Sequence, residues 1–360
     1  MRLTRNGFMP GKRDKRRSIL LLALLGLLSF NLKTPSGSIQ PRHSQTSQGP
    51  KEERESPLEP SIKVPLGLPE IPVPASNPMT KDKIDLGREL FFDKRLSEDA
   101  TVSCASCHNP QKGFSDANPL SPGIHGLKGL RHTPTLINVA FQPYQFWDGR
   151  ASSLEDQTLG PLHNPAEMGP SAQEAVTRLK GLPYYREQFQ KVFHGPITRE
   201  NISLALASFE RTIVSGNSPY DQYVAGNKTS LNQKALRGLD LFNGKAHCKL
   251  CHQGFNFSDG LFHNLGVGWN GKEFSDVGRY GVTGIFKDRG AFKTPTLRQI
   301  CQTVPYMHDG SLATLEAVLD FYDQGGNPNP QLDVLIQPLH LTSEEKETLL
   351  EFLRSLTGQE

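Results

Sequence analysis

Two short cysteine motifs constrain the fold of this chain more than any other feature. The first, "CASCH", begins at residue 104, and the second, "CKLCH", begins at residue 248. In each motif two residues separate the thiols, and a histidine follows the second one. This is the pattern of covalent haem attachment, in which the thiols bond the vinyl groups of the porphyrin and the histidine ligates the iron. The residues predicted to hold two haem c groups are Cys104, Cys107 and His108, and Cys248, Cys251 and His252.

Other uses of these cysteines fit the motifs less well. A structural zinc site needs a closed set of four thiolate or imidazole ligands, and a thioredoxin-like redox pair does not need the histidine. The fifth cysteine, Cys301 in "TLRQICQTVPY", is interpreted as a small buried apolar residue, with a reactive thiol as the alternative.

The amino terminus predicts export. Basic residues precede the apolar run "SILLLALLGLLSF", so residues 1–30 are interpreted as a signal peptide. The alternative is an uncleaved anchor in the cytoplasmic membrane, because no clear small-residue cleavage site follows the run. Residues 31–78 are rich in Pro, Ser and charged residues and are predicted to be a linker. We therefore expect a periplasmic protein that contacts the membrane only through an uncleaved leader.

The rest of the chain has the composition of a globular protein. With 36% hydrophobic and 21% charged residues over a length of 360, it can bury a core and form two domains. The net charge of +3 comes largely from the first 17 residues, and the remainder is slightly acidic, which argues against nucleic acid as a partner.

An internal repeat accompanies the two motifs. "LGRELFF" and "LRGLDLF" precede them, "GFSD" and "NFSD" follow, and "TPTL" occurs in each half before the related stretches "WDGRASSLEDQ" and "HDGSLATLEAV". We expect two haem domains in tandem, residues 79–228 (the first half) and 229–360 (the second half).

Helical patterns dominate both halves. Helices are predicted at 86–92, 171–180, 198–214 and 236–242, and after Thr342, where Thr342 and Glu345 form a capping box. Strand patterns are sparse. The predicted fold class is mostly α, with two tandem cytochrome c-like haem domains and long loops.

The repeat also exposes a difference between the halves. Aligning Asp148 with Asp309 places Pro161 against Tyr322. A tyrosine oxygen can ligate haem iron, whereas a proline offers no ligand. If this position faces the open side of each haem, the second iron is closed and the first can bind peroxide. Alternatively, Tyr322 is an ordinary amphipathic helix residue.

With these motifs, the chain resembles the bacterial di-haem cytochrome c peroxidase family and its MauG-like branch. The resemblance covers about residues 78–358 and rests on the two haem motifs, "QFWDGRASSLEDQ", "NPAEM", "TPTLR" and "PYMHDGSLATLEAV". It implies that the first haem reacts with peroxide and the second transfers electrons. It further implies that Glu167 is the acid/base, that Gln157 hydrogen-bonds the bound peroxide or water, and that Trp147 relays electrons between the haems.

The same resemblance bears on the iron ligands. It implies His108 and His252 as proximal ligands, and Tyr322 as the second ligand of the second iron, where the classical peroxidases have methionine. Met307 is a weaker candidate for that place. The classical resting-state histidine corresponds to Ile124, next to His125, which is interpreted as a surface loop histidine, with a shifted iron ligand as the alternative. The family's calcium site corresponds to His132, Thr303 and Pro305, and histidine is a poor ligand for calcium, so calcium is doubtful here.

Three functions follow as hypotheses. The first is a di-haem peroxidase that reduces hydrogen peroxide to water with electrons from a small cytochrome c or a cupredoxin. The second is a MauG-like oxidase that uses peroxide to oxidise side chains of a partner protein. The third is a di-haem electron carrier, against which Pro161 and Glu167 argue. The resemblance also allows a homodimer.

Overall fold

The computed structural model describes residues 62–169 and 171–359 of the chain. The predicted leader, and the predicted linker up to residue 61, lie outside these residues. The described part is mostly helical, as expected, with one small antiparallel sheet. The helices are α1 (Lys81–Phe92), α2 (Cys104–Cys107), α3 (Leu154–Gln157), α4 (Ala172–Lys180), α5 (Pro183–Phe193), α6 (Arg199–Glu210), α7 (Pro219–Val224), α8 (Gln233–Asn243), α9 (Tyr280–Thr283), α10 (Leu315–Asp323) and α11 (Ser343–Arg354), and the strands are β1 (Phe262–Asn264) and β2 (Ala291–Lys293).

The predicted helices are confirmed, but their ends differ: α1 and α8 begin before the predicted residues 86 and 236, and one helix is shorter than predicted. The capping box at Thr342 forms at the start of α11, where Glu345 accepts from the Thr342 N–H and Thr342 accepts from the Glu345 N–H. The helix predicted to run to residue 214 ends at Glu210, because the chain turns there and Thr212 N–H donates to the carbonyl of Phe209. Ile213 is nevertheless buried, as its spacing predicted.

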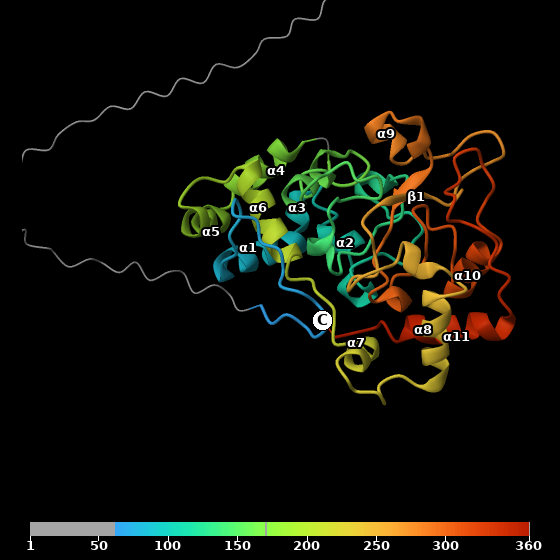
Figure 1. Ribbon diagram of the computed structural model, residues 1–360. Helices are drawn as coiled ribbons and strands as arrows, with labels where there is room; N and C mark the ends of the chain where they lie inside the picture. Colours follow the sequence, from blue (N-terminus) through green and yellow to red (C-terminus); the bar gives the residue numbers. More distant parts are fainter. Residues whose placement is uncertain (1–61, 170, 360) are drawn as a thin grey trace, which may run out of the picture. The chain divides into compact units, whose positions relative to one another are not determined.

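A pair of crossing helices organises each half. In the first half α1 packs against α6, and in the second half α8 packs against α11 (Figure 1). Each crossing has a glycine at its closest point. A Cβ on Gly87 would collide with the carbonyl of Ala205, and one on Gly238 would collide with the carbonyl of Thr348. The two hydrophobic cores are built around these crossings.

The backbone repeats the same hydrogen bonds in the two halves. Ser115 Oγ donates to the carbonyl of Thr133 at 2.7 Å, and Ser258 Oγ donates to that of Thr294 at the same distance. Asn138 and Gln299, at equivalent places after "TPTL", both have left-handed backbones. The internal repeat seen in the sequence therefore extends to the local geometry of the loops.

The two halves also meet through equivalent backbone groups. The N–H of His132 donates to the carbonyl of His308 at 2.7 Å, and the N–H of Lys293 donates to the carbonyl of Trp147 at 2.8 Å. Position 293 is the repeat equivalent of 132, and 308 that of 147, since 161 residues separate the members of each pair. The contact is therefore reciprocal, like that of a dimer with a two-fold axis.

Ionic contacts reinforce this junction. Arg131 of the first half pairs with Asp148 at 2.6 Å and with Asp276 of the second half at 2.6 Å. Arg279 of the second half donates to the carbonyls of Asp148 and Gly149. These bonds hold the loops that carry Trp147 against the second half.

The last residues of the predicted linker are packed against the first half. The side chain of Asn77 is fully buried, accepts from Lys83 Nζ at 2.9 Å and donates to Glu155 at 2.7 Å. Farther upstream, the carbonyl of Leu66 accepts from the N–H of Asn217 at 2.7 Å. Among the residues described, no helix combines the length and apolar character needed to cross a lipid bilayer.

Candidate active site

One continuous cavity reaches from the first cysteine motif to the second. Residues of both motifs line it, and most of the other lining side chains are apolar, including Leu206, Phe242, Leu319 and Leu353. The six motif residues in its wall are Cys104, Cys107, His108, Cys248, Cys251 and His252. The structure therefore brings the predicted haem-binding residues to the same internal space.

Each motif histidine is held in the same way. His108 Nδ1 lies 3.1 Å from the carbonyl of Phe114, and His252 Nδ1 lies 2.9 Å from the carbonyl of Phe257. A carbonyl only accepts, so Nδ1 carries the proton and Nε2 keeps its lone pair for a metal. Burial lowers the pKa of His108 to about 4 and also lowers that of His252. Both imidazoles are therefore neutral, as iron ligation requires.

The cavity also contains polar atoms without protein partners. Gln157 Oε1, Glu210 Oε2 and His308 Nε2 are buried and have no hydrogen-bond partner within the described ranges. Buried polar groups are normally paired, so such atoms point to a molecule that the chain encloses. Apolar walls, paired thiols and neutral imidazoles fit haem c in both motifs.

Gln157 and Glu167 line the first half of this cavity. Gln157 ends α3, and Pro161 opens the next turn, a short 3-10 helix (Pro161–His163), because proline lacks the N–H that would continue the helix. The loop that follows carries Glu167, whose Oε1 accepts from Asn164 Nδ2 at 2.6 Å. Burial raises the pKa of Glu167, although the bond from Asn164 and the charge of Arg150 oppose this. A carboxyl that gains and loses its proton more readily near neutral pH suits acid/base chemistry.

Tyr322 lines the second half of the cavity from α10. Thr314 caps this helix just as Ser153 caps α3, but α10 continues without interruption through Tyr322. Burial, followed by the nearness of Cys248 and Cys251, raises the pKa of Tyr322. The hydroxyl therefore keeps its proton in the protein alone, and a bound ferric iron favours the phenolate.

Met307 also lines the cavity. Its backbone is left-handed, with φ of 71°, like that of its repeat equivalent Phe146, with φ of 65°. Phe146 directly precedes Trp147, and Met307 directly precedes His308, at the junction between the two halves. Met307 is therefore placed by the turn that the repeat shares rather than by a helix facing the cavity.

Trp147 lies at the junction between the halves and also lines the cavity. Its indole Nε1 donates to the carbonyl of His132 at 2.8 Å, and its own carbonyl accepts from Lys293 N–H. The first bond fixes the indole ring and the second fixes the backbone of Trp147 at the junction between the two halves.

His125 lies at the surface, outside the cavity wall. Its ring is 3.7 Å from the carboxylate of Asp99, and 58% of its side chain is exposed, whereas Ile124 is buried. The sequence interpretation of His125 as a surface loop histidine agrees with this position.

The residues at the calcium position do not fit calcium. The imidazole of His132 is engaged by the carbonyl of Asn118 at 3.0 Å and by Ser115 Oγ at 3.3 Å. It offers nitrogen rather than oxygen, and the Thr303 hydroxyl donates to the carbonyl of Ile300. Calcium takes oxygen ligands, so this set lacks the side-chain ligand it would need.

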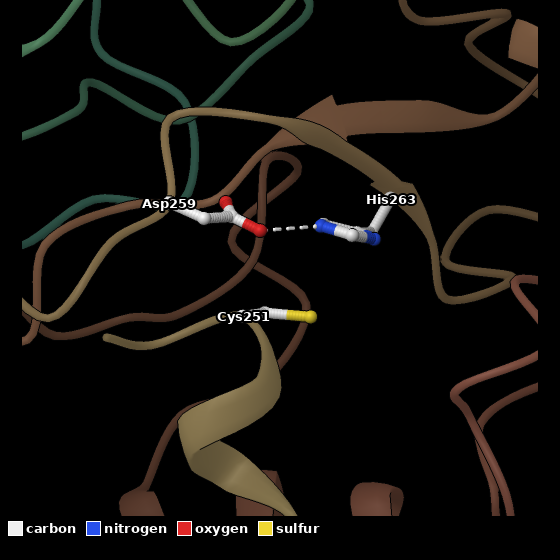
Figure 2. A group of neighbouring side chains, drawn as sticks. All are labelled: Cys251, Asp259 and His263. Atoms are coloured by element: carbon white, nitrogen blue, oxygen red, sulfur yellow. Dashed lines mark hydrogen bonds and ion pairs between the residues drawn. The ribbon is translucent and has the colours of Figure 1, made fainter.

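Cys251, Asp259 and His263 form a cluster with the spacing of a metal site (Figure 2). His263 Nε2 lies 2.9 Å from Asp259, and Nδ1 lies 2.6 Å from Asp333. As a free thiol Cys251 raises the pKa of His263 most, and the hydrogen bonds with Asp333 and Asp259 raise this pKa as well. Because Cys251 is a haem thiol, we interpret the cluster as a brace that ties the second motif to the loop around Asp333.

Sequence reasoning missed four polar groups of this region: Glu210, His263, Lys293 and His308. Alignment of the two halves could have identified two of them, since His308 is the equivalent of Trp147 and Lys293 is the equivalent of His132. Glu210 had none, because it lies far along the chain from the first motif, and His263 had none, because its contact with Asp333 spans 70 residues.

Comparison with known proteins decides the family. The model of the family described as di-haem cytochrome c peroxidase matches residues 81–229. The methylamine utilization protein MauG of Methylorubrum extorquens is 41% identical over 293 residues, covering 80% of this chain and 82% of the relative. The chain belongs to the di-haem cytochrome c peroxidase family.

Two further relatives agree with this membership. The cytochrome c551 peroxidase of Nitrosomonas europaea is 38% identical over 292 residues, which cover 80% of this chain and 84% of that protein. The crystal structure of a MauG-like protein associated with microbial copper homeostasis has a TM-score of 0.75 and 36% identity, covering 82% of this chain and 95% of that one. As a member of this family, the chain carries two covalently bound haem c groups.

Proposed function

We propose that this di-haem peroxidase consists of two tandem haem domains, residues 79–228 and 229–360, and that it reduces hydrogen peroxide to water at the first. The observation that carries the proposal is the asymmetry between the two sites. Where the second half has Tyr322 on an unbroken helix, the first has a proline, followed by a loop that places Glu167 in the cavity wall.

The chemistry at the first site needs a proton carrier. Haem iron, once bound, supplies electrons for cleavage of the O–O bond. The Glu167 carboxylate takes a proton from one peroxide oxygen and delivers it to the other, which leaves as water. The Gln157 amide oxygen, which lacks a protein partner in the described part of the chain, accepts a hydrogen bond from the peroxide and orients it. Two electrons and two further protons complete the reduction to two molecules of water.

The second site serves the first by passing electrons. With His252 and Tyr322 as its ligands the second iron would be closed to peroxide, and the oxygen ligand would stabilise its oxidised form. Trp147 lies on the way between the sites, with its ring fixed by the bond to His132. We propose that electrons reach the first site through this indole.

A second candidate function is oxidation of a partner protein's side chains. It is favoured by Tyr322, which the resemblance places in the MauG-like branch, and by the 41% identity to a methylamine utilization protein MauG. In this case the partner replaces the electron-donating cytochrome c or cupredoxin. We propose an exported, periplasmic location for either function.

The test is the substitution Glu167→Gln in the holoprotein. Peroxide turnover falls about 10²- to 10⁴-fold, the range that a general acid/base contributes, while both haems stay attached. The matched control is Glu200→Gln, which changes an exposed carboxylate in the first turn of α6. Full turnover in Glu167→Gln would remove the acid/base role, and equal loss in both variants would point to a folding defect.

A further inference from the structure

Two polar residues of the cavity, Lys293 and His308, have no part in the function proposed above. They are the second-half equivalents of His132 and Trp147, and their backbones form the reciprocal contact between the halves. In the first half, both equivalents have protein partners: His132 is engaged by Asn118 and Ser115, and Trp147 donates to a carbonyl. In the second half the two side chains lack such partners.

Lys293 is a cation without an anion. Its side chain lines the cavity from β2, and no acidic group of the described residues lies within ion-pair distance. Burial alone lowers its pKa to about 8. Lys293 is half-buried and lines the cavity, and an ammonium group in such a confined space without a partner is costly, so its retention here indicates an anionic partner that the chain itself does not supply.

His308 has a fixed ring and a free nitrogen. Only 3% of the residue is exposed, and its ring stacks on Phe292 with the centroids 3.5 Å apart. Its carbonyl is held by His132 N–H, and its Nε2 is buried without a partner among the residues described. Charged groups near this ring are Asp309, Asp276 and Arg131, and Arg131 is already paired with two carboxylates.

The haem itself can supply the anion that occupies this space. Haem c is held by its vinyl groups at the cysteines, and its only anionic groups are two propionate carboxylates. A carboxylate accepts hydrogen bonds from an ammonium and from an imidazole N–H alike. We propose that Lys293 and His308 bind the propionate carboxylates of the second haem.

This assignment has an electrostatic consequence. The reduced haem carries one more negative charge than the oxidised haem, so a nearby lysine cation stabilises the reduced form and raises the reduction potential. At an effective dielectric of about 20, a unit charge interaction across about 10 Å still exceeds tenfold in an equilibrium constant. Lys293 therefore offsets the lowering of potential that an oxygen ligand on the second iron causes.

The test is Lys293→Met in the holoprotein, with the midpoint potential of each haem measured by optical redox titration. The equilibrium constant for reducing the second haem falls at least tenfold, which corresponds to 59 mV for one electron. The first haem keeps its potential. Lys293→Arg, which retains the charge, restores most of the loss. The matched control is Lys272→Met, which removes an exposed lysine of the second half that lies outside the haem motif and leaves the potential nearly unchanged because solvent screens that charge.

His308 is tested separately by His308→Leu. Loss of its hydrogen bond shifts the propionate-bending band of the second haem in resonance Raman spectra, with the haem content unchanged. The proposal is overturned if Lys293→Met leaves the second potential in place, if it shifts the first potential instead, or if both variants leave the propionate bands unchanged.

Discussion

Among single residues, the sharpest contrast between the two sites is that of Pro161 and Tyr322. The proline cannot ligate iron and interrupts a helix, whereas the tyrosine extends an unbroken one. Around Pro161 the chain places a carboxyl and an amide, and both can hydrogen-bond a small oxygen-containing substrate. The proposed division between a reacting site and an electron-transfer site thus rests on a few side-chain differences on one repeated framework.

The acid/base role proposed for Glu167 predicts that kcat/KM for peroxide depends on pH. Burial raises its pKa, and the hydrogen bond from Asn164 opposes this rise. The substitution Asn164→Asp removes that donor, keeps the acceptor for Ala166 N–H and adds a negative charge, so it favours the protonated form of Glu167. Because the carboxylate form accepts the peroxide proton, the acid limb of kcat/KM against pH moves to higher pH.

Asn201→Asp is the control, since it changes an amide in the first turn of α6 that donates to the carbonyl of Pro196 and not to Glu167. An unshifted acid limb in Asn164→Asp would mean that another group limits the rate at low pH.

The sequence predicted functional residues where they lie close together along the chain. Adjacent cysteines and histidine define each haem motif within five positions, and the structure places all six residues around one cavity. Lys293 and His308 were not predicted as ligand-binding residues, because such a role can be inferred only once the side chain is known to lack a protein partner. That absence depends on tertiary packing, which no local pattern encodes.

Among the elements, the two helix crossings set the positions of the motifs. Each motif comes after the first helix of a crossing, and the glycine at the contact allows the two helices to approach closely. Helix periodicity predicted these elements but not their ends. The helix that ends at Glu210 was predicted to be longer, since apolar residues continue in helical spacing past the turn that stops it.

The crossing predicts an unusual effect of Gly238→Ala. Alanine normally stabilises a helix relative to glycine by about 1 kcal/mol. Here its Cβ would meet the carbonyl of Thr348 and come within 2.8 Å of Phe352 Cβ. We therefore expect a net loss of about 1–3 kcal/mol, as for other overpacked sites, measured as a lower Tm of the holoprotein.

Gly281→Ala in α9 is the matched control, because the added Cβ there makes only an ordinary contact of 3.6 Å with Val277. A Tm of Gly238→Ala equal to or above that of the unchanged protein would contradict the close packing of α8 against α11.

Considering the molecule as a whole, the reciprocal contact explains why two similar halves work as one enzyme. The loops that bear Trp147 and His308 are hydrogen-bonded to each other's half, so the space between the two motifs is shared. The sequence predicted two halves from the repeat, but not their mutual placement. That placement depends on long-range pairs such as Arg131 with Asp276, whose members are far apart in sequence.

The Arg131 bridge predicts a pH-dependent stability. Burial pushes the pKa of Asp276 up, but hydrogen bonds from Arg131 and from Gly278 N–H outweigh it, so the pKa lies below its ordinary value. A lowered folded-state pKa stabilises the protein above the unfolded pKa, and this contribution is lost as pH falls through the folded value. Arg131→Gln should therefore cost about 1–3 kcal/mol at neutral pH and much less in acid, as followed by thermal unfolding.

Arg354→Gln, which breaks an exposed pair with Glu351 at 3.3 Å, serves as the control and should cost less than about 1 kcal/mol at any pH. An Arg131→Gln variant with the same pH profile as the unchanged protein would show that the bridge does not hold the halves together.

The central claim is that the first haem is open at rest and the second is closed by Tyr322. Its most direct test is to mix the fully oxidised holoprotein with one equivalent of hydrogen peroxide, without reductant, and to follow optical and electron paramagnetic resonance spectra. The account predicts rapid loss of the resting ferric signals. Ferric spectra that stay unchanged until an electron is supplied would contradict it, because a ligand would then block the first site at rest.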